Sequence, residues 1–201
     1  MSNITSLELP SAPAAQEPPR RRAIRRRSRG WALVFSVALA LSVALPVLLG
    51  AAVLFYDGPL LSFGSGGIWI GRAPDEVAGL LPLTAFSSSQ RQAGTVAVAL
   101  LAMPAIFVLF HLRQLFRLYA AGSVFTRANA RRLKAVALGL ALYAFAPFLA
   151  NRLVMYAGVT SDPAWFHFDE IMALLLGALL FVIADVMELG GEIELDRDGF
   201  V

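Results

Sequence analysis

The sequence predicts an all-α integral membrane protein, a four-helix bundle with both termini in the cytoplasm and a disordered, arginine-rich N-terminal tail. Three observations predict this fold. Of the 201 residues, 58% are hydrophobic and only 15% are charged, whereas soluble domains contain about 45–50% apolar and about 25% charged residues. Four long apolar segments follow one another along the chain. Lys and Arg concentrate in alternate connections between these segments, which is typical of cytoplasmic loops.

The first 30 residues differ in composition from the rest of the chain. Pro, Ala, Ser and Glu dominate as far as Pro19, and seven arginines then fall between Arg20 and Arg29. A segment of this composition buries too little apolar surface to order itself. We therefore expect residues 1–30 to be a disordered cytoplasmic tail. The apolar stretch that follows is longer than the roughly 7–15 residues of a signal-peptide core, so we interpret it as an uncleaved membrane span.

Four apolar segments reach the length of a membrane span once their flanks are included. A helix needs about 20 residues to cross roughly 30 Å of hydrocarbon. We expect a membrane domain over residues 31–201, with spans at about 31–55, 93–112, 133–153 and 167–187. The remaining segments are an outer loop at 56–92, a cytoplasmic basic hairpin at 113–134 and an acidic tail at 188–201.

The distribution of Lys and Arg predicts the orientation of these spans. The N-terminal tail carries seven, and the basic hairpin carries six between Arg113 and Lys134. The outer loop has only Arg72 and Arg91, and residues 154–170 contain neither Lys nor Arg. Since cytoplasmic loops carry the excess of Lys and Arg, both termini are expected to be cytoplasmic.

The apolar outer loop is expected to form a short hairpin or to rest on the membrane, with a ligand-sensing cap as the alternative.

The basic hairpin carries helix-terminating signals and a familiar pattern. Gly122 is suited to end one helix, and Thr126 is suited to cap the next. The stretch from Leu115 to Leu133, LFRLYAAGSVFTRANARRL, resembles the signature of a bacterial membrane-protein family catalogued as domain of unknown function 2975. The residues that carry this resemblance are Gly122, Phe125, Asn129 and Leu133. The acidic ending ELGGEIELDRDGFV is also similar to that family.

The resemblance implies a small four-helix protein of the bacterial plasma (inner) membrane. It implies no assigned reaction, and it provides no catalytic residues to transfer to this chain. It also implies a partner, a small helix-turn-helix regulator, beside which such proteins are thought to work. The arginine-rich tail ending at Arg29 lies outside the family pattern.

The predicted spans contain few polar side chains, which argues against a transporter or channel acting alone. A proton or ion path needs a chain of polar or ionisable groups across the membrane. Apart from His111 near the end of the second span, the polar side chains within the apolar cores of the spans are Ser36, Ser42, Thr95 and Tyr143. The chain contains no cysteine and no recognisable catalytic motif. We therefore expect no enzymatic activity and no cofactor, and we expect small residues such as Ala173 and Gly177 to bring helices close together.

Asp162, His167, Asp169 and Glu170 form the one group that combines histidine with carboxylates. His167 and Glu170 are three residues apart and can share a helix face. A metal site is one reading of this group. The reading that we favour is a set of polar residues at a helix start, near the outer membrane interface.

The arginine clusters are expected to anchor the protein on the cytoplasmic side and to contact anionic lipid headgroups. No recognition fold or aromatic interleaving accompanies them, so direct binding to nucleic acid is not expected.

The cytoplasmic side combines a basic hairpin with an acidic end of the fourth helix. Our hypothesis is that the acidic end docks on the hairpin through weak, breakable ion pairs; the alternative is a solvated tail with arginines facing lipid headgroups. The candidate interaction residues are Arg113, Arg117, Arg127, Arg131, Arg132, Lys134, Asp185, Glu188, Glu192, Glu194, Asp196 and Asp198. Two functions follow: a membrane-bound interaction or regulatory component, or a non-catalytic subunit of a transport or membrane-enzyme complex whose partners are other membrane subunits.

Overall fold

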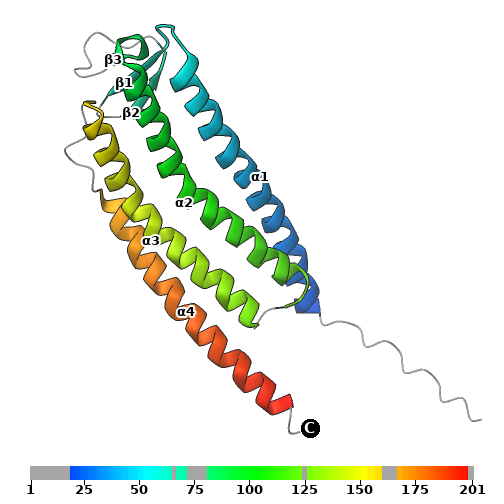
Figure 1. The fold of residues 1–201 in the computed structure, drawn as a ribbon. Coiled ribbons are helices and arrows are strands. Elements are labelled where there is room, and N and C mark those ends of the chain that lie inside the picture. The colour runs from blue at the N-terminus through cyan, green and yellow to red at the C-terminus, as the bar shows by residue number, and fades with distance from the viewer. Residues whose placement is uncertain (1–18, 65–66, 72–80, 124–125, 160–166, 199–201) are drawn as a thin grey trace, which may run out of the picture.

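The computed structural model describes residues 19–64, 67–71, 81–123, 126–159 and 167–198, with the side chains of residues 19–21, 64, 67–68 and 193–198 outside that description. The described residues form four long helices (Figure 1), which are α1 (Pro19–Phe55), α2 (Ser88–Ala120), α3 (Arg127–Tyr156) and α4 (Phe168–Asp198). All four are long and apolar enough to cross a membrane. The predicted all-α, four-helix fold is confirmed.

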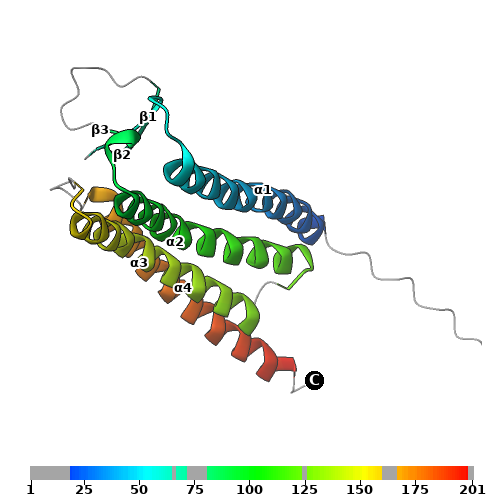
Figure 2. The same ribbon diagram turned by 45° about the horizontal axis from the view of Figure 1, so that its top comes forward.

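The four helices pack in the order in which they occur in the chain. Each helix contacts the next one extensively, α1 on α2, α2 on α3, and α3 on α4. Consecutive helices run in opposite directions and form a row (Figures 1 and 2). Within the described residues, α1 and α4 make no extensive contact with each other. They are therefore the two edges of the row.

Glycines lie where neighbouring helices approach most closely. A Cβ added at Gly139 on α3 would lie 2.5 Å from Val108 Cγ2 and 3.0 Å from Phe107 Cδ1 on α2. A Cβ added at Gly177 on α4 would lie 3.0 Å from the backbone carbonyl oxygen of Ala137 on α3. Small residues permit this approach and the dispersion contacts that come with it. The expected role of Gly177 in close helix contact therefore agrees with the structure.

The prediction of a disordered tail over residues 1–30 is wrong for residues 19–30. Helix α1 begins at Pro19 and includes the whole arginine run; residues 1–18 lie outside the described residues. Arginine is a good helix former, and proline is well tolerated at the first helical position. Because the apolar span already forms a helix, extending it through the arginines requires no new nucleation.

Helix α4 likewise continues beyond its predicted span, through Asp198. The acidic segment predicted as a tail from residue 188 is thus helical as far as the structure describes it. The four helices contain 37, 33, 30 and 31 residues. At about 1.5 Å per residue they are roughly 45–55 Å long, which exceeds the roughly 30 Å of hydrocarbon that a span must cross.

The turn of the basic hairpin is closed by backbone and cap hydrogen bonds. Gly122 adopts a φ of 92°, a conformation that glycine enters without strain. Its amide donates to the carbonyl of Tyr119, and the Ser123 amide donates to Leu118, the pattern of a Schellman C-cap. The Thr126 side chain accepts from the Asn129 amide. Both predicted helix-terminating residues, Gly122 and Thr126, are confirmed.

The opposite end of the row carries a small antiparallel sheet in the predicted outer loop. Strands β1 (Leu61–Gly64), β2 (Gly67–Ile70) and β3 (Leu81–Pro82) pair in the order β2-β1-β3, followed by a 3-10 turn at Leu83–Ala85. The expected short hairpin therefore forms, between β1 and β2.

Arg91 joins this sheet to the helices. Its guanidinium forms an ion pair with Asp57 at 2.8 Å and donates to the carbonyl oxygens of Leu83 at 2.9 Å and Tyr56 at 3.3 Å. The side chain is only 12% exposed. The arginine thus fixes the end of α1 and the 3-10 turn that follows the sheet to the start of α2.

Replacing Gly177 by leucine tests the close contact of α3 and α4. The larger side chain must displace the Ala137 backbone, so we expect the Gly177→Leu variant to lose about 1–3 kcal/mol of unfolding free energy. Gly190 provides a matched control on the same helix because a Cβ there would meet nothing within 4 Å. Gly190→Leu should keep or slightly raise stability. Thermal unfolding in mild detergent measures both, and equal stability of the two variants would contradict the packing argument.

Candidate functional site

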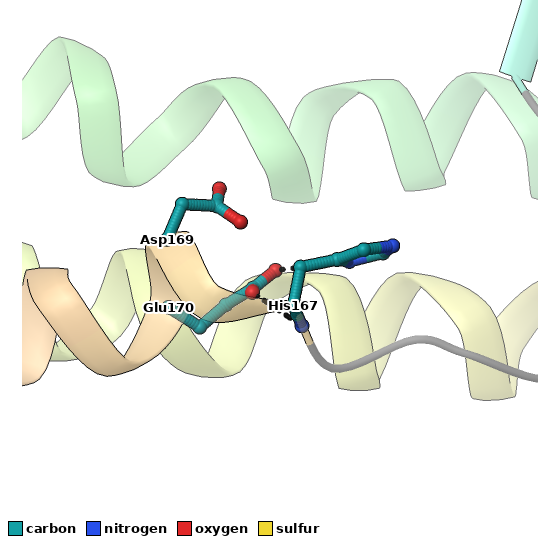
Figure 3. A group of neighbouring side chains, drawn as sticks. All are labelled: His167, Asp169 and Glu170. Atoms are coloured by element: carbon teal, nitrogen blue, oxygen red, sulfur yellow. Dashed lines mark hydrogen bonds and ion pairs between the residues drawn. The ribbon is translucent and has the colours of Figure 1, made fainter.

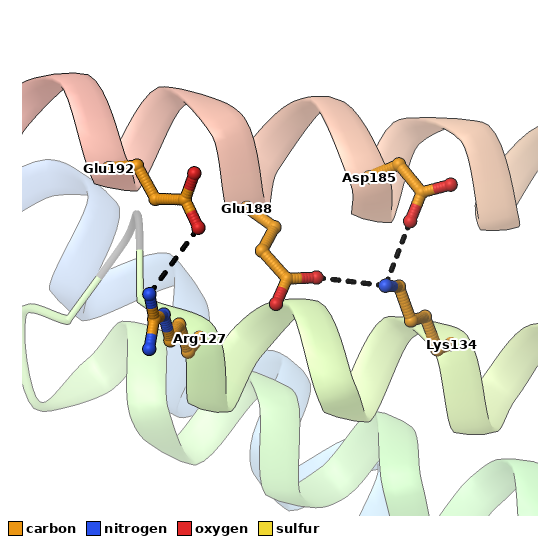
Figure 4. Close-up of polar contacts among 5 residues, drawn as sticks. All are labelled: Arg127, Lys134, Asp185, Glu188 and Glu192. Carbon is orange, nitrogen blue, oxygen red and sulfur yellow. Dashed lines mark hydrogen bonds and ion pairs between the residues drawn. The ribbon is translucent and has the colours of Figure 1, made fainter.

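The basic hairpin and the acidic end of α4 lie side by side at one end of the row (Figure 4). Lys134 Nζ lies 2.8 Å from Asp185 Oδ1 and 2.8 Å from Glu188 Oε2. Closer to the start of α3, Arg127 Nη2 lies 3.3 Å from Glu192 Oε1. We call these three pairs the ion-pair ladder. From the charges alone, we expect twelve residues of the hairpin and the acidic end to interact. The structure places five of these twelve in direct contact.

The ladder forms because both helices repeat their charges with helical spacing. Lys134 follows Arg127 by seven residues on α3, which is close to two helical turns. Asp185, Glu188 and Glu192 are three and four residues apart on α4, so they share one face. Since α3 and α4 run antiparallel, each cation meets a carboxylate at its own height.

A buried apolar layer lies next to the ladder and holds α4 on the hairpin. Leu115 of α2, Leu133 of α3 and Ala184 of α4 form one buried cluster, in which Ala184 is fully buried. Tyr119 and Met187 pack against it. The ion pairs themselves are open to solvent to different degrees, from 68% side-chain exposure at Arg127 to 31% at Lys134. Exposed ion pairs contribute little to stability. The ladder can therefore open while the buried layer keeps the helices together.

The other basic residues of the hairpin have different surroundings. Arg132 Nη1 lies 3.3 Å from His111 Nδ1, across α2 and α3. Arg113 has a buried Nε without a hydrogen-bond partner. Arg117 and Arg131 are exposed. Among the described residues, no carboxylate forms an ion pair with Arg113, Arg117 or Arg131, so these charges remain open to another partner. The side chains of Glu194, Asp196 and Asp198 lie outside the described residues.

The residues of the family-like motif close the hairpin that carries these charges. Gly122 ends α2, as described above. Asn129 is fully buried, and its Nδ2 donates to the carbonyl oxygen of Ser123 at 2.7 Å. Leu133 belongs to the buried apolar cluster. Phe125 lies outside the described residues. The described residues of the motif thus hold α2 and α3 together at a short turn.

His167, Asp169 and Glu170 gather at the start of α4 (Figure 3). Their candidate ligand atoms lie within 4.8 Å of one another. However, the nearly buried Glu170 carboxylate accepts a hydrogen bond from the His167 amide at 2.6 Å. A glutamate that accepts from the amide just before a helix is a standard N-terminal cap. This geometry fits the expected polar helix start, and Asp162 lies outside the described residues.

Two of the hydroxyls predicted within the spans are satisfied by their own helices. Ser36 donates to the Ala32 carbonyl at 2.7 Å, and Thr95 donates to the Arg91 carbonyl at 3.0 Å. A hydroxyl that donates to a carbonyl of its own helix has used its proton locally. It therefore adds no link to a proton or ion path across the membrane.

A comparison with known protein families places this architecture in one of them. The family model described as "Protein of unknown function (DUF2975)" matches residues 30–198. No curated protein matches the chain. No solved structure matches it either.

Replacing Asn129 by alanine tests the closure of the hairpin. The variant leaves the partly buried Ser123 carbonyl without its side-chain donor, so we expect a loss of about 0.5–1.5 kcal/mol in unfolding free energy. Ser123→Ala is the matched control because Ser123 contributes only its backbone carbonyl to this bond. Chemical unfolding in detergent compares the two. A loss in Ser123→Ala equal to that in Asn129→Ala would contradict this account.

Removing the acidic end tests the ladder. We expect a chain ending at Leu189 to show severalfold faster proteinase K cleavage in the 120–127 turn, because Arg127 loses its contact with Glu192. In the full chain, 0.5 M salt should also speed cleavage, since salt screens exposed charges; in the shortened chain, which keeps only the pairs of Lys134 with Asp185 and Glu188, the effect of salt should be smaller. A chain ending at Asp198 controls for truncation itself. Unchanged protease sensitivity of the hairpin would refute docking of the acidic end.

Proposed function

The chain belongs to the DUF2975 family, whose function is unknown, and from its own geometry we propose that it is a multi-pass membrane protein that acts as an interaction or regulatory component. Its partner binds at the charged end of the helix row. The observation that carries this proposal is the ion-pair ladder, which joins Lys134 and Arg127 to three carboxylates of α4 through exposed, breakable contacts.

The charge distribution supports an orientation with this end in the cytoplasm. The arginine run at the start of α1 and the basic hairpin carry thirteen Lys and Arg residues between Arg20 and Lys134, apart from Arg72 and Arg91. Both groups belong to the same end of the row. Cytoplasmic segments next to spans carry such an excess. We therefore propose that both termini lie in the cytoplasm, with arginines near anionic lipid headgroups. The resemblance to a bacterial membrane-protein family supports the further proposal that this membrane is a bacterial plasma membrane.

The ladder provides a mechanism by which a partner binds. A protein with a basic surface can take the carboxylates of Asp185, Glu188 and Glu192 from their partners on α3. The Arg127–Glu192 pair is exposed and the pairs of Lys134 are only partly buried, so little free energy opposes this exchange. A small helix-turn-helix regulator fits that description, since DNA-binding proteins carry basic surfaces. Binding would release Arg127 and Lys134, and so couple the partner to the hairpin.

The second candidate is a non-catalytic subunit of a transport or membrane-enzyme complex. The observation that favours it is the open row, in which the outer faces of α1 and α4 present large apolar side chains such as Leu48 and Val182 to the surroundings. Other membrane subunits would cover these faces. The lack of a polar path through the described helices means that any chemistry would be supplied by those subunits.

A crosslinked pull-down from native membranes separates the two candidates. We expect the full chain to capture a soluble regulator that a chain ending at Leu189 does not capture. The full-length variant Asp185→Asn/Glu188→Gln/Glu192→Gln serves as the matched control because it removes charge without shortening α4, and it should also lose the regulator.

Capture of membrane subunits by all three forms would favour the complex-subunit role instead. Capture of the same soluble regulator by all three forms, or of no protein by the full chain, would contradict the proposed role of the acidic end.

A further inference from the structure

The two edges of the helix row carry exposed apolar stripes with the spacing of a helix-packing interface. On α4 the most exposed aliphatic side chains alternate in steps of four and three residues, each at 55–63% exposure; they are Leu175, Leu179, Val182, Val186 and Leu189. This is the heptad spacing by which two helices pack along their length. The outer face of α1 shows the same steps, at Leu33, Val37, Ala40, Ala44, Val47 and Ala51, all exposed.

The stripes are complementary in size. The α4 stripe consists of leucine and valine, whereas the α1 stripe includes alanines at 40, 44 and 51. Ala40 and Ala44 are four residues apart, the small-xxx-small pattern that lets membrane helices approach closely. Large side chains on one helix can therefore fit over small ones on the other.

Contacts across the row show which parts of α1 and α4 lie at the same height. Phe35 of α1 stacks near Phe116 of α2, with ring centroids 5.2 Å apart. Leu115, which precedes Phe116 in α2, shares a buried cluster with Leu133 of α3 and Ala184 of α4. From this chain of contacts we infer that residue 35 of α1 and residue 184 of α4 lie at a similar height in the row.

From this level, the two edge helices carry opposite charge over a similar length, although the described carboxylates of α4 pair with α3. The arginines of α1 lie between Arg29 and Arg20, six to fifteen residues from Phe35. The carboxylates of α4 lie between Glu188 and Asp198, four to fourteen residues from Ala184. At about 1.5 Å per residue, both sets cover roughly the same 6–22 Å beyond that level. Arg22, Arg26 and Arg27 are exposed on α1, so they can pair with carboxylates of another chain.

From these observations we propose that the chain assembles with copies of itself, the outer face of α4 packing against the outer face of α1 of the next copy. The acidic end of α4 then faces the neighbour's arginine run. The contact also preserves the antiparallel alternation of the row, because α4 and α1 run in opposite directions.

Symmetric pairing of like edges is disfavoured by charge. Copies in one membrane share their orientation, so a two-fold axis would stand normal to the membrane. Such an axis would place the arginine run against itself at an α1 edge, or the carboxylates against themselves at an α4 edge. Only the α4-to-α1 contact brings opposite charges together. A contact between two different surfaces closes into a ring or continues as an open array.

The absence of cysteine from the chain makes a clean crosslinking experiment possible. Val37→Cys and Val182→Cys lie at similar heights on the two edges. In native membranes, oxidation of the double variant should give a series of dimers and larger multimers. Coexpressing the two single variants should give one mixed dimer and no larger product. Replacing Arg22, Arg26 and Arg27 by glutamine should reduce the crosslinked fraction severalfold, while four arginines of the run remain.

A matched control uses Leu138→Cys in place of Val182→Cys. Leu138 is 55% exposed and lies on α3, away from either edge. The Val37→Cys/Leu138→Cys variant should give no series of multimers. Equal crosslinking of this control would indicate random collision and overturn the proposal. Strong dimers of the single Val37→Cys variant would overturn it in favour of a symmetric contact, and so would complete absence of crosslinks in the edge variant.

Discussion

The structure depends on how closely apolar helices can approach one another. Inside hydrocarbon, apolar side chains gain nothing by leaving lipid for another helix, so association depends on close packing. Gly139 brings α3 against Val108 and Phe107 of α2, and Gly177 brings α4 against the Ala137 backbone. These contacts fix the register of each helix against the next. The positions of the charged residues at the helix ends follow from that register, including the height at which Lys134 meets Asp185 and Glu188.

At the charged end, buried groups hold the helices together and the ion pairs beside them are open to solvent. The cluster of Leu115, Leu133 and Ala184 excludes solvent and holds α4 to the hairpin. The turn itself is held by Asn129, which donates to the Ser123 carbonyl from a fully buried position. The ion pairs beside these groups are exposed and contribute little to holding the fold. Opening them changes which charges face a partner without unfolding the protein, and this separation is what an interaction surface requires.

Much of the fold could be predicted from the sequence because its signals are local. Segment length and hydropathy predicted four helices, and Gly122 and Thr126 marked the ends of two of them. The helical state of the arginine run was missed because composition alone describes a segment in isolation, whereas residues 19–30 extend a helix that already exists. The pairs of the ladder required the register of α3 against α4, which depends on the contact at Gly177. The row arrangement was also not predictable, since each span is apolar around most of its circumference and does not reveal which face meets a neighbour.

The two proposals for this protein make use of the same carboxylates. Asp185 and Glu192 are about half exposed while paired within the chain, so they retain capacity for a second cation. A neighbouring copy would present arginines of α1 to them, and a soluble partner would present its own basic surface. A carboxylate held by one of these cations is less available to the other, so the two binding events oppose each other. By thermodynamic linkage, a partner that weakens the contact between copies must bind more tightly to the separated chain, to the same extent. Assembly in the membrane would thereby set how readily the acidic end of α4 is offered to the cytoplasm.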